Sequence, residues 1–256
     1  MSLELRHIQV RRGGRDLLRV SRLQLEAGVF TAFCGPNGAG KSTALSLLSA
    51  SLEPDQGSVY LDQVSLQSWP VQKLAQRRAM VSQHNPLNFP FQVHEVVAMG
   101  RMPHQSDSRA QRDSQVIDQC MEWWDLTPLA GRNILTLSGG ERQRVHLARA
   151  LAQVWDTPSN TPAWLLLDEP TTGLDLKYQL RLFDVLQTLA KRGWGVVAVL
   201  HELHWVREHA QRVVLFEQGR IVGDGKPQSC LSPERIQSAY GLAQPYEVPA
   251  PLNTRG

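Results

Sequence analysis

The chain has 256 residues, 42% of them hydrophobic and 20% charged, which suits one large α/β domain with a sizeable core. Its formal net charge of +3 is too small to indicate a nucleic-acid partner, and its charged, alternating start is unlike a signal peptide. Cys34, Cys120 and Cys230 stand far apart with no C-x-x-C pair, so we expect reduced thiols in a cytosolic protein.

The first 83 residues are expected to alternate strands and helices. Alternating apolar residues predict strands over 3–10 and 17–25, joined by a turn at Gly13 and Gly14. The elements predicted next are a strand at 29–34, a helix at 42–49, a strand at 58–61, a helix at 73–78 and a strand at 79–82.

Beyond Gln83 the pattern becomes helical before it returns to strands. Residues 84–92 should form a loop, 93–99 and 109–126 have helical periodicity, and we expect a helical subdomain inserted over about 85–151. After a polar loop at 155–162, strands at 164–167, 196–200 and 213–216 alternate with helices at 176–191 and 202–209, which predicts a largely parallel sheet. A helix over 227–241 and a loose tail over 244–256 should close a single domain of residues 1–243.

The apolar runs are too short to cross a bilayer. The longest, 164–167 and 195–200, fall far below the length that a spanning helix needs. If this protein serves a membrane, another chain must supply the spanning helices.

A phosphate-cradling motif follows the strand predicted at 29–34. It fits G-x-x-x-x-G-K-S/T, set between a strand and a helix as the motif requires, although a chance glycine-rich turn is the alternative. The motif residues are Gly35, Pro36, Asn37, Gly38, Ala39, Gly40, Lys41, Ser42 and Thr43. We expect Lys41 to reach the β- and γ-phosphates and the Ser42 hydroxyl to bind Mg²⁺. The motif predicts a bound nucleotide but not its use.

An acidic pair ends the apolar strand predicted at 164–167. Asp168 is placed to bind Mg²⁺, directly or through water, and Glu169 to polarise an attacking water as a general base. The alternative is an ordinary strand that ends in a helix-capping acid. An unbroken apolar strand before two adjacent acids favours the first interpretation.

A second anion site is indicated at the start of another predicted helix. Ser138, Gly139 and Gly140 precede Glu141, so backbone N–H groups and the helix N-terminus could face an anion. Taken alone, the stretch is more typical of a helix N-terminus with a capping box.

Together the three motifs resemble those of the ATP-binding subunits of ABC transporters, over about residues 3–240. The resemblance makes Gln83 the glutamine that senses Mg²⁺ and the γ-phosphate and links to the membrane subunits. It makes Asp175 the D-loop aspartate and His201 the switch histidine that contacts the γ-phosphate. It implies an α/β P-loop ATPase core with an antiparallel β subdomain and an inserted helical subdomain.

The resemblance also implies partners and a location. Two copies would face head to tail, with each ATP held between one copy's phosphate loop and the other's Ser138 stretch. This homodimer would sit peripherally on two transmembrane permease subunits at the cytoplasmic face of the bacterial inner membrane. The segment 85–104 would dock on the permease, and a periplasmic binding protein would deliver the cargo from the other side.

Stretches outside the shared motifs resemble the ATPases of hemin importers, within the group that serves iron-siderophore and cobalamin uptake. These stretches are Phe89-Pro90-Phe91, Gly100-Arg101-Met102-Pro103-His104 and Ala152-Gln153-Val154-Trp155. Hemin is therefore the expected cargo. A ferric siderophore or cobalamin is the alternative, and a soluble ABC-type ATPase that does not serve transport is the rival of a different class.

Two departures from the family concern the adenine and the switch. Many members stack an aromatic residue on adenine near the first hairpin, but residues 10–14 contain none. Arg12 stands nearest that position, and we expect its guanidinium plane to cover the adenine. A solvated hairpin arginine, with nearby apolar groups holding the base, is an equal alternative. The usual His-Asp pair at the switch reads His201-Glu202 here.

Overall fold

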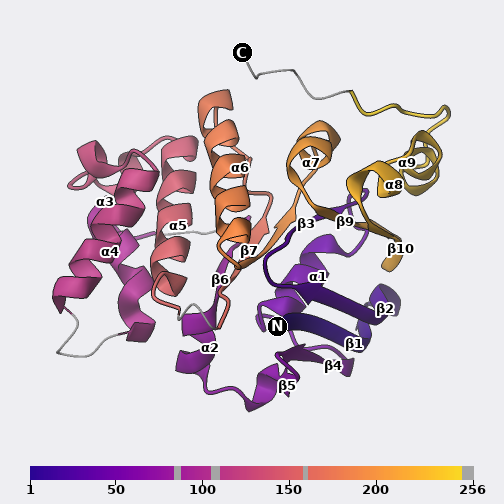
Figure 1. The fold of residues 1–256 in the computed structure, drawn as a ribbon, viewed down its shortest axis with the longest axis horizontal. Helices are drawn as coiled ribbons and strands as arrows, with labels where there is room; N and C mark the ends of the chain where they lie inside the picture. The colour runs from indigo at the N-terminus through magenta and orange to yellow at the C-terminus, as the bar shows by residue number, and fades with distance from the viewer. Residues whose placement is uncertain (84–87, 105–109, 158–160, 250–256) are drawn as a thin grey trace.

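Two sheets and a group of helices form the structure (Figure 1), a computed structural model that describes residues 1–83, 88–104, 110–157 and 161–249. A six-stranded sheet in the order β10-β9-β3-β8-β7-β6 forms the centre. Its strands are β3 (Phe30–Cys34), β6 (Arg78–Val81), β7 (Trp164–Asp168), β8 (Gly195–Val199), β9 (Arg212–Glu217) and β10 (Arg220–Gly225). All neighbours in it are parallel except β9 and β10.

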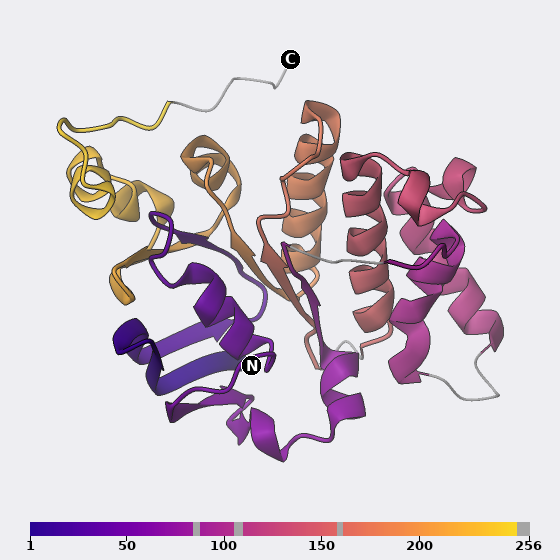
Figure 2. The ribbon, with the colours of Figure 1, turned by 180° about the vertical axis from the view of Figure 1, so that it is seen from behind.

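The central strands are apolar without interruption because both faces of the six-stranded sheet are covered. In β7, for example, Leu165 and Leu167 belong to the same core cluster as α5 (Gly139–Val154) and α6 (Leu176–Lys191). Trp164 and Leu166 point to the other side and share a core cluster with α1 (Lys41–Leu48). α1 lies between this sheet and a second, antiparallel one (Figure 2). The motif that precedes α1 is thereby fixed at the carboxyl end of β3.

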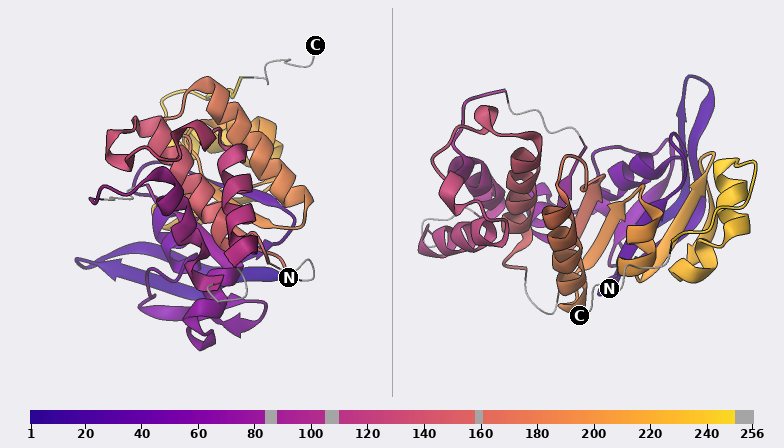
Figure 3. Two further views of the ribbon diagram at one scale, coloured as in Figure 1. Left: turned by 90° about the vertical axis from the view of Figure 1, so that its left-hand side faces the viewer. Right: turned by 90° about the horizontal axis from the view of Figure 1, so that it is seen from above.

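The second sheet has four antiparallel strands in the order β2-β1-β4-β5. They are β1 (Ser2–Arg12), β2 (Arg15–Glu26), β4 (Gln56–Leu61) and β5 (Val64–Ser65). β1 and β2 form a hairpin in which Leu5 pairs with Leu23 and Val10 with Leu18, so their buried faces coincide. The hairpin projects from the molecule at the end opposite the helical group (Figure 3, right).

The helical group packs beside the β6 edge of the six-stranded sheet. It contains α3 (Val93–Ala98), η2 (Met99–His104), α4 (Ala110–Trp123), η4 (Thr127–Leu129), η5 (Ile134–Thr136) and α5 (Gly139–Val154). The remaining helices are η1 (Leu66–Ser68), α2 (Val71–Arg77), α6 (Leu176–Lys191), α7 (Leu203–His209), α8 (Pro227–Cys230) and α9 (Pro233–Tyr240). Of the helices that the structure describes, none has the length and apolar composition needed to cross a membrane.

Most predicted elements are confirmed, and the α/β class with an antiparallel subdomain and a helical subdomain is correct. α6 begins and ends at the predicted residues, and its start is fixed by the Asp175 side chain, which accepts from the Tyr178 N–H at 3.1 Å. Parts of the predicted loop 84–92 and helix 109–126 lie outside the described residues. The boundaries of the helical subdomain remain a prediction.

The C-terminal part differs from the prediction in three ways. The single helix predicted over 227–241 is wrong, since the structure has two, the second capped by Ser232 and started by Pro233. Strand β10 was not predicted. In the tail that we expected to be loose, Val248 is buried and its carbonyl accepts a hydrogen bond from Arg207 at 2.6 Å. Residues 250–256 lie outside the described part.

Candidate functional site

A cavity of about 630 Å³ lies at the carboxyl end of the parallel strands, over the N-terminus of α1. It brings together residues from five separate parts of the chain. They are Leu17, Asn37, Gly38, Ala39, Gly40, Lys41, Ser42, Thr43, Gln83, Glu169 and His201. In an open parallel sheet this edge is where ligands bind, and the helix N-terminus makes it suitable for an anion.

The glycines of the phosphate loop are required by their backbone. Gly35 and Gly40 have φ angles of 137° and 99°, in the region that favours glycine. A Cβ on Gly35 would lie 2.1 Å from the Phe216 carbonyl oxygen, and one on Gly40 would lie 2.8 Å from that of Leu17. The loop is therefore packed tightly against β9 and β2, which fixes its curvature.

Lys41 is buried at the base of this loop. Its Nζ donates to the carbonyl oxygens of Gly35 and Pro36, each at 2.7 Å. Burial lowers the pKa of Lys41, while the neighbouring carboxylates oppose that shift. A buried ammonium held only by neutral carbonyls is well suited to exchange them for a phosphate anion.

Ser42 and Asp168 meet at the other side of the loop. The Ser42 hydroxyl donates to Asp168 Oδ1 at 3.0 Å. Burial raises the pKa of the Asp168 carboxyl, and the Ser42 hydrogen bond opposes that rise. A hydroxyl and a largely buried carboxylate at a phosphate site are the hard oxygen donors that Mg²⁺ prefers, so these residues fit that ion. Gln83, the third residue expected at the ion, donates to Glu169 instead.

Glu169 is the centre of the polar contacts in the cavity. Its Oε2 accepts from Gln83 Nε2 at 2.8 Å, and its Oε1 lies 2.7 Å from His201 Nε2. The residue has a φ of 50°, which is uncommon outside glycine and costs roughly 1–3 kcal/mol. The structure thus brings together the three residues predicted to be catalytic, which follow the ends of β6, β7 and β8, although they are 86 and 32 residues apart in sequence.

The Ser138 stretch and Asp175 are not among the residues that line the cavity. Ser138 caps α5 in a capping box, with Oγ accepting from the Glu141 N–H at 3.2 Å and its own N–H donating to Glu141 at 2.7 Å. Gly140 approaches the D-loop so closely that a Cβ would lie 2.5 Å from the Gly173 carbonyl oxygen. Ser138, Gly139 and Asp175 are exposed, so they face outward.

Arg12 does not line the cavity, whereas Leu17, which was not predicted, does. The Arg12 guanidinium donates to the Arg11 carbonyl at 2.6 Å and lies 3.4 Å from Asp55. Stacking on adenine would require this exposed ion pair to open. Leu17 is on the face of β2 opposite to buried Leu18 and Val20, and this alternation is the signal that could have identified it.

Replacement of these two residues distinguishes the two ways of holding the base. We expect Leu17→Ala to weaken ATP binding several-fold, because an apolar contact of about 1 kcal/mol or more is lost. Arg12→Ala should weaken it no more than the stacking contact that it could form, about 0.5–1 kcal/mol. Nucleotide titration of both variants measures this directly. A larger loss of nucleotide affinity in Arg12→Ala than in Leu17→Ala would show that Arg12 contacts the adenine.

Comparison with known proteins gives the same family over most of the chain. Residues 18–172 match the family described as ABC transporter. The hemin import ATP-binding protein HmuV of Gloeobacter violaceus is 43% identical over 235 residues, which cover 92% of this chain and 86% of that protein. The protein of the same name from Pseudomonas aeruginosa is 42% identical over 240 residues, covering 94% and 92%.

Solved structures agree with the fold. A metal-chelate type ABC transporter in an inward-facing conformation superposes with a TM-score of 0.76 and 28% identity, covering 93% of this chain and 88% of that one. A dimeric ATP-binding cassette bound to ADP and Pi gives a TM-score of 0.77 and 25% identity, covering 88% and 98%. The motifs, the fold and the relatives agree that this chain belongs to the ABC transporter family, as an ATP-binding subunit.

Proposed function

We propose that this chain hydrolyses ATP with Mg²⁺ to drive the import of hemin. The observation that supports hemin as the cargo is the identity of 40–43% to hemin import ATP-binding proteins over about nine-tenths of the chain. The cavity supports the reaction, since the phosphate loop and Glu169 line it together and the Ser42–Asp168 pair lies at the same loop.

The phosphate loop and Lys41 hold the nucleotide in this proposal. Backbone N–H groups of the loop and the N-terminus of α1 face the phosphates, and Lys41 exchanges its two carbonyl partners for phosphate oxygens. Ser42 and Asp168 would hold Mg²⁺, with Gln83 as the third predicted contact. When bound, that ion neutralises charge on the β- and γ-phosphates.

Glu169 acts as the general base. Both of its oxygens are engaged in the structure, one by Gln83 and the other by His201. When these two side chains turn to the γ-phosphate, the carboxylate is freed to accept a proton from the attacking water. The contacts therefore link nucleotide arrival to activation of the base.

A second copy completes the site. Ser138 and Gly139 are exposed at the N-terminus of α5 and, with half-buried Gly140, lie outside the cavity of their own chain, which suits contact with the γ-phosphate in a partner. Asp175 lies beside them, after the Gly173 that Gly140 contacts. The dimeric cassette among the similar structures supports this arrangement.

The membrane partners are two permease subunits at the cytoplasmic face of the bacterial inner membrane. A hemin-binding periplasmic protein would act on the other side. To test this, the chain is tagged and co-purified from membranes, and hydrolysis by the complex is measured with binding protein loaded with hemin, a ferric siderophore or cobalamin. Stimulation by hemin alone supports the proposal. Stimulation by another cargo would reassign the substrate, and absence of any permease would favour a soluble ATPase.

The segment that follows Gln83 is the proposed docking surface, within the predicted range 85–104. Its residues 84–87 lie outside the described part, but Phe89 is 68% exposed. We expect a cysteine at Phe89 to crosslink to a cytoplasmic helix of the permease in the assembled complex. The native cysteines Cys34, Cys120 and Cys230 are buried, so they should not compete in the crosslinking reaction. A cysteine at exposed Val222, on β10 at the opposite edge, is the control, and crosslinks from it but not from Phe89 would contradict the assignment.

A further inference from the structure

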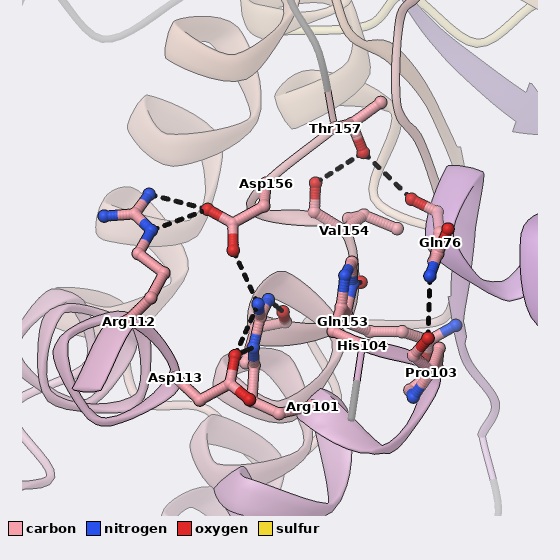
Figure 4. Close-up of polar contacts among 11 residues, drawn as sticks. Gln76, Arg101, Pro103, His104, Arg112, Asp113, Gln153, Val154, Asp156 and Thr157 are labelled. Carbon is pink, nitrogen blue, oxygen red and sulfur yellow. Dashed lines mark hydrogen bonds and ion pairs between the residues drawn. The ribbon is translucent and has the colours of Figure 1, made fainter. Parts of the chain in front are cut away.

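Arg101 in η2 is buried among three groups that hold its guanidinium (Figure 4). Its Nε donates to Asp113 Oδ1 of α4 at 2.9 Å. Nη1 donates to the Ala152 carbonyl of α5 at 2.6 Å, and Nη2 to Asp156 Oδ2 at 2.5 Å. The side chain is 3% exposed, so a buried cation is compensated by two carboxylates and a helix carbonyl.

The rest of η2 is fastened to the same end of α5. A Cβ on Gly100 would lie 2.3 Å from the Arg149 carbonyl oxygen, so the two backbones touch. His104 Nε2 lies 2.7 Å from the Gln153 carbonyl oxygen. Gln76 of α2 donates to the Pro103 carbonyl at 2.7 Å. These contacts make η2 a fixed junction between α2, α4 and the C-terminus of α5.

The other end of α5 carries the Ser138 stretch. There Gln143 donates to the Pro170 carbonyl at 3.1 Å, directly after Glu169. The 16 residues of α5 span roughly 24 Å at 1.5 Å per residue. A displacement of η2 that is transmitted to α5 would therefore reach the surface proposed to meet the partner's ATP.

We propose that Arg101 is a positioning residue that couples the permease-docking segment 88–104 to α5. The inference rests on the proposed permease contact. α3, in the same segment, packs on α5 through Val93, Val96 and Val97, and apolar packing permits small sliding. The guanidinium instead has fixed donor directions, which hold η2 and α5 in one register.

Replacement of Arg101 by lysine tests this coupling. Arg101→Lys keeps the charge but cannot reach Asp113, Ala152 and Asp156 together. We expect the purified chain to keep its ATP affinity and hydrolysis and to co-purify with the permease. Stimulation of the complex by hemin-loaded binding protein should fall about fivefold or more, the scale of coupling between two sites.

Arg112 provides the matched control. It binds Asp156 Oδ1 from α4, through Nε at 3.0 Å and Nη2 at 2.6 Å, but it is 47% exposed, and among the described residues it makes no hydrogen bond to η2 or α5 itself. Arg112→Lys alters a partner of the Asp156 carboxylate that Arg101 also binds, and it should leave stimulation as in the wild type. Thermal unfolding of both variants monitors stability.

Three outcomes would overturn the proposal. These are wild-type stimulation in Arg101→Lys, an equal loss of unstimulated and stimulated hydrolysis, and the same loss in Arg112→Lys. If Arg101→Lys does not fold, Asp113→Ala removes one carboxylate that accepts from Arg101, and it is judged by the same stimulation of hydrolysis over the unstimulated rate. A wild-type complex without any stimulation would instead contradict the proposed function, so the two failures are distinguishable.

Discussion

Glu169→Gln should bind ATP and lose turnover. The amide keeps the shape of the side chain and still accepts a hydrogen bond, but it cannot take a proton from water. We expect hydrolysis to fall ~10²-fold or more, the usual contribution of a general base. The variant should also remain as an ATP-bound dimer in size-exclusion runs.

Glu26→Gln is the control for Glu169→Gln, because Glu26 ends β2 outside the cavity. It should hydrolyse ATP as the wild type does. Near-normal turnover in Glu169→Gln would remove Glu169 from the role of base, and loss of ATP binding would show that the carboxylate holds the nucleotide site together.

Ser138→Arg should abolish hydrolysis and leave ATP binding by the monomer nearly intact. The bulky cation occupies the α5 N-terminus that is offered to the partner, while the cavity of its own chain contains no atom of Ser138. The change also removes the cap on the Glu141 N–H, which costs about 1 kcal/mol. Hydrolysis and nucleotide titration of the purified variant separate the two effects.

A second serine cap isolates the cost of capping. Ser232 caps α9 by accepting from the Arg235 N–H at 3.4 Å, away from the cavity. Ser232→Arg should lose comparable stability and keep hydrolysis. If Ser138→Arg also loses ATP binding as a monomer, the site shared between two copies is contradicted.

Much of the fold could be predicted because its signals are local. The central strands are continuous apolar runs, and α6 follows an N-capping aspartate. β10 escaped prediction because Gly223 and Gly225 weaken its pattern, and a register shift between Ile221 and Gly223 breaks the alternation. The break between α8 and α9, where one helix was predicted, could have been predicted from Ser232-Pro233, an N-cap followed by proline at the first helical position.

The motif residues of the site were also predictable, whereas the contacts between them were not. The apolar strand before it identified Glu169, and the family resemblance identified Gln83 and His201. Neither could show that one carboxylate holds the other two side chains, since this depends on neighbouring parallel strands. Leu17 enters the cavity through the register of the hairpin, and Arg12 pairs with Asp55 across a turn. The contacts of Glu169 and Arg12 arise from tertiary packing, which periodicity does not encode, whereas the direction of Leu17 follows from the alternation along β2.

Hemin uptake by proteoliposomes tests the central claim most directly. The chain is reconstituted with its co-purified permease, with ATP on the side of the chain and hemin-loaded binding protein on the other. We predict that hemin accumulates with the wild type and not with Glu169→Gln. Accumulation that proceeds equally with Glu169→Gln, or ATP hydrolysis by the wild type without any movement of hemin, would contradict the account.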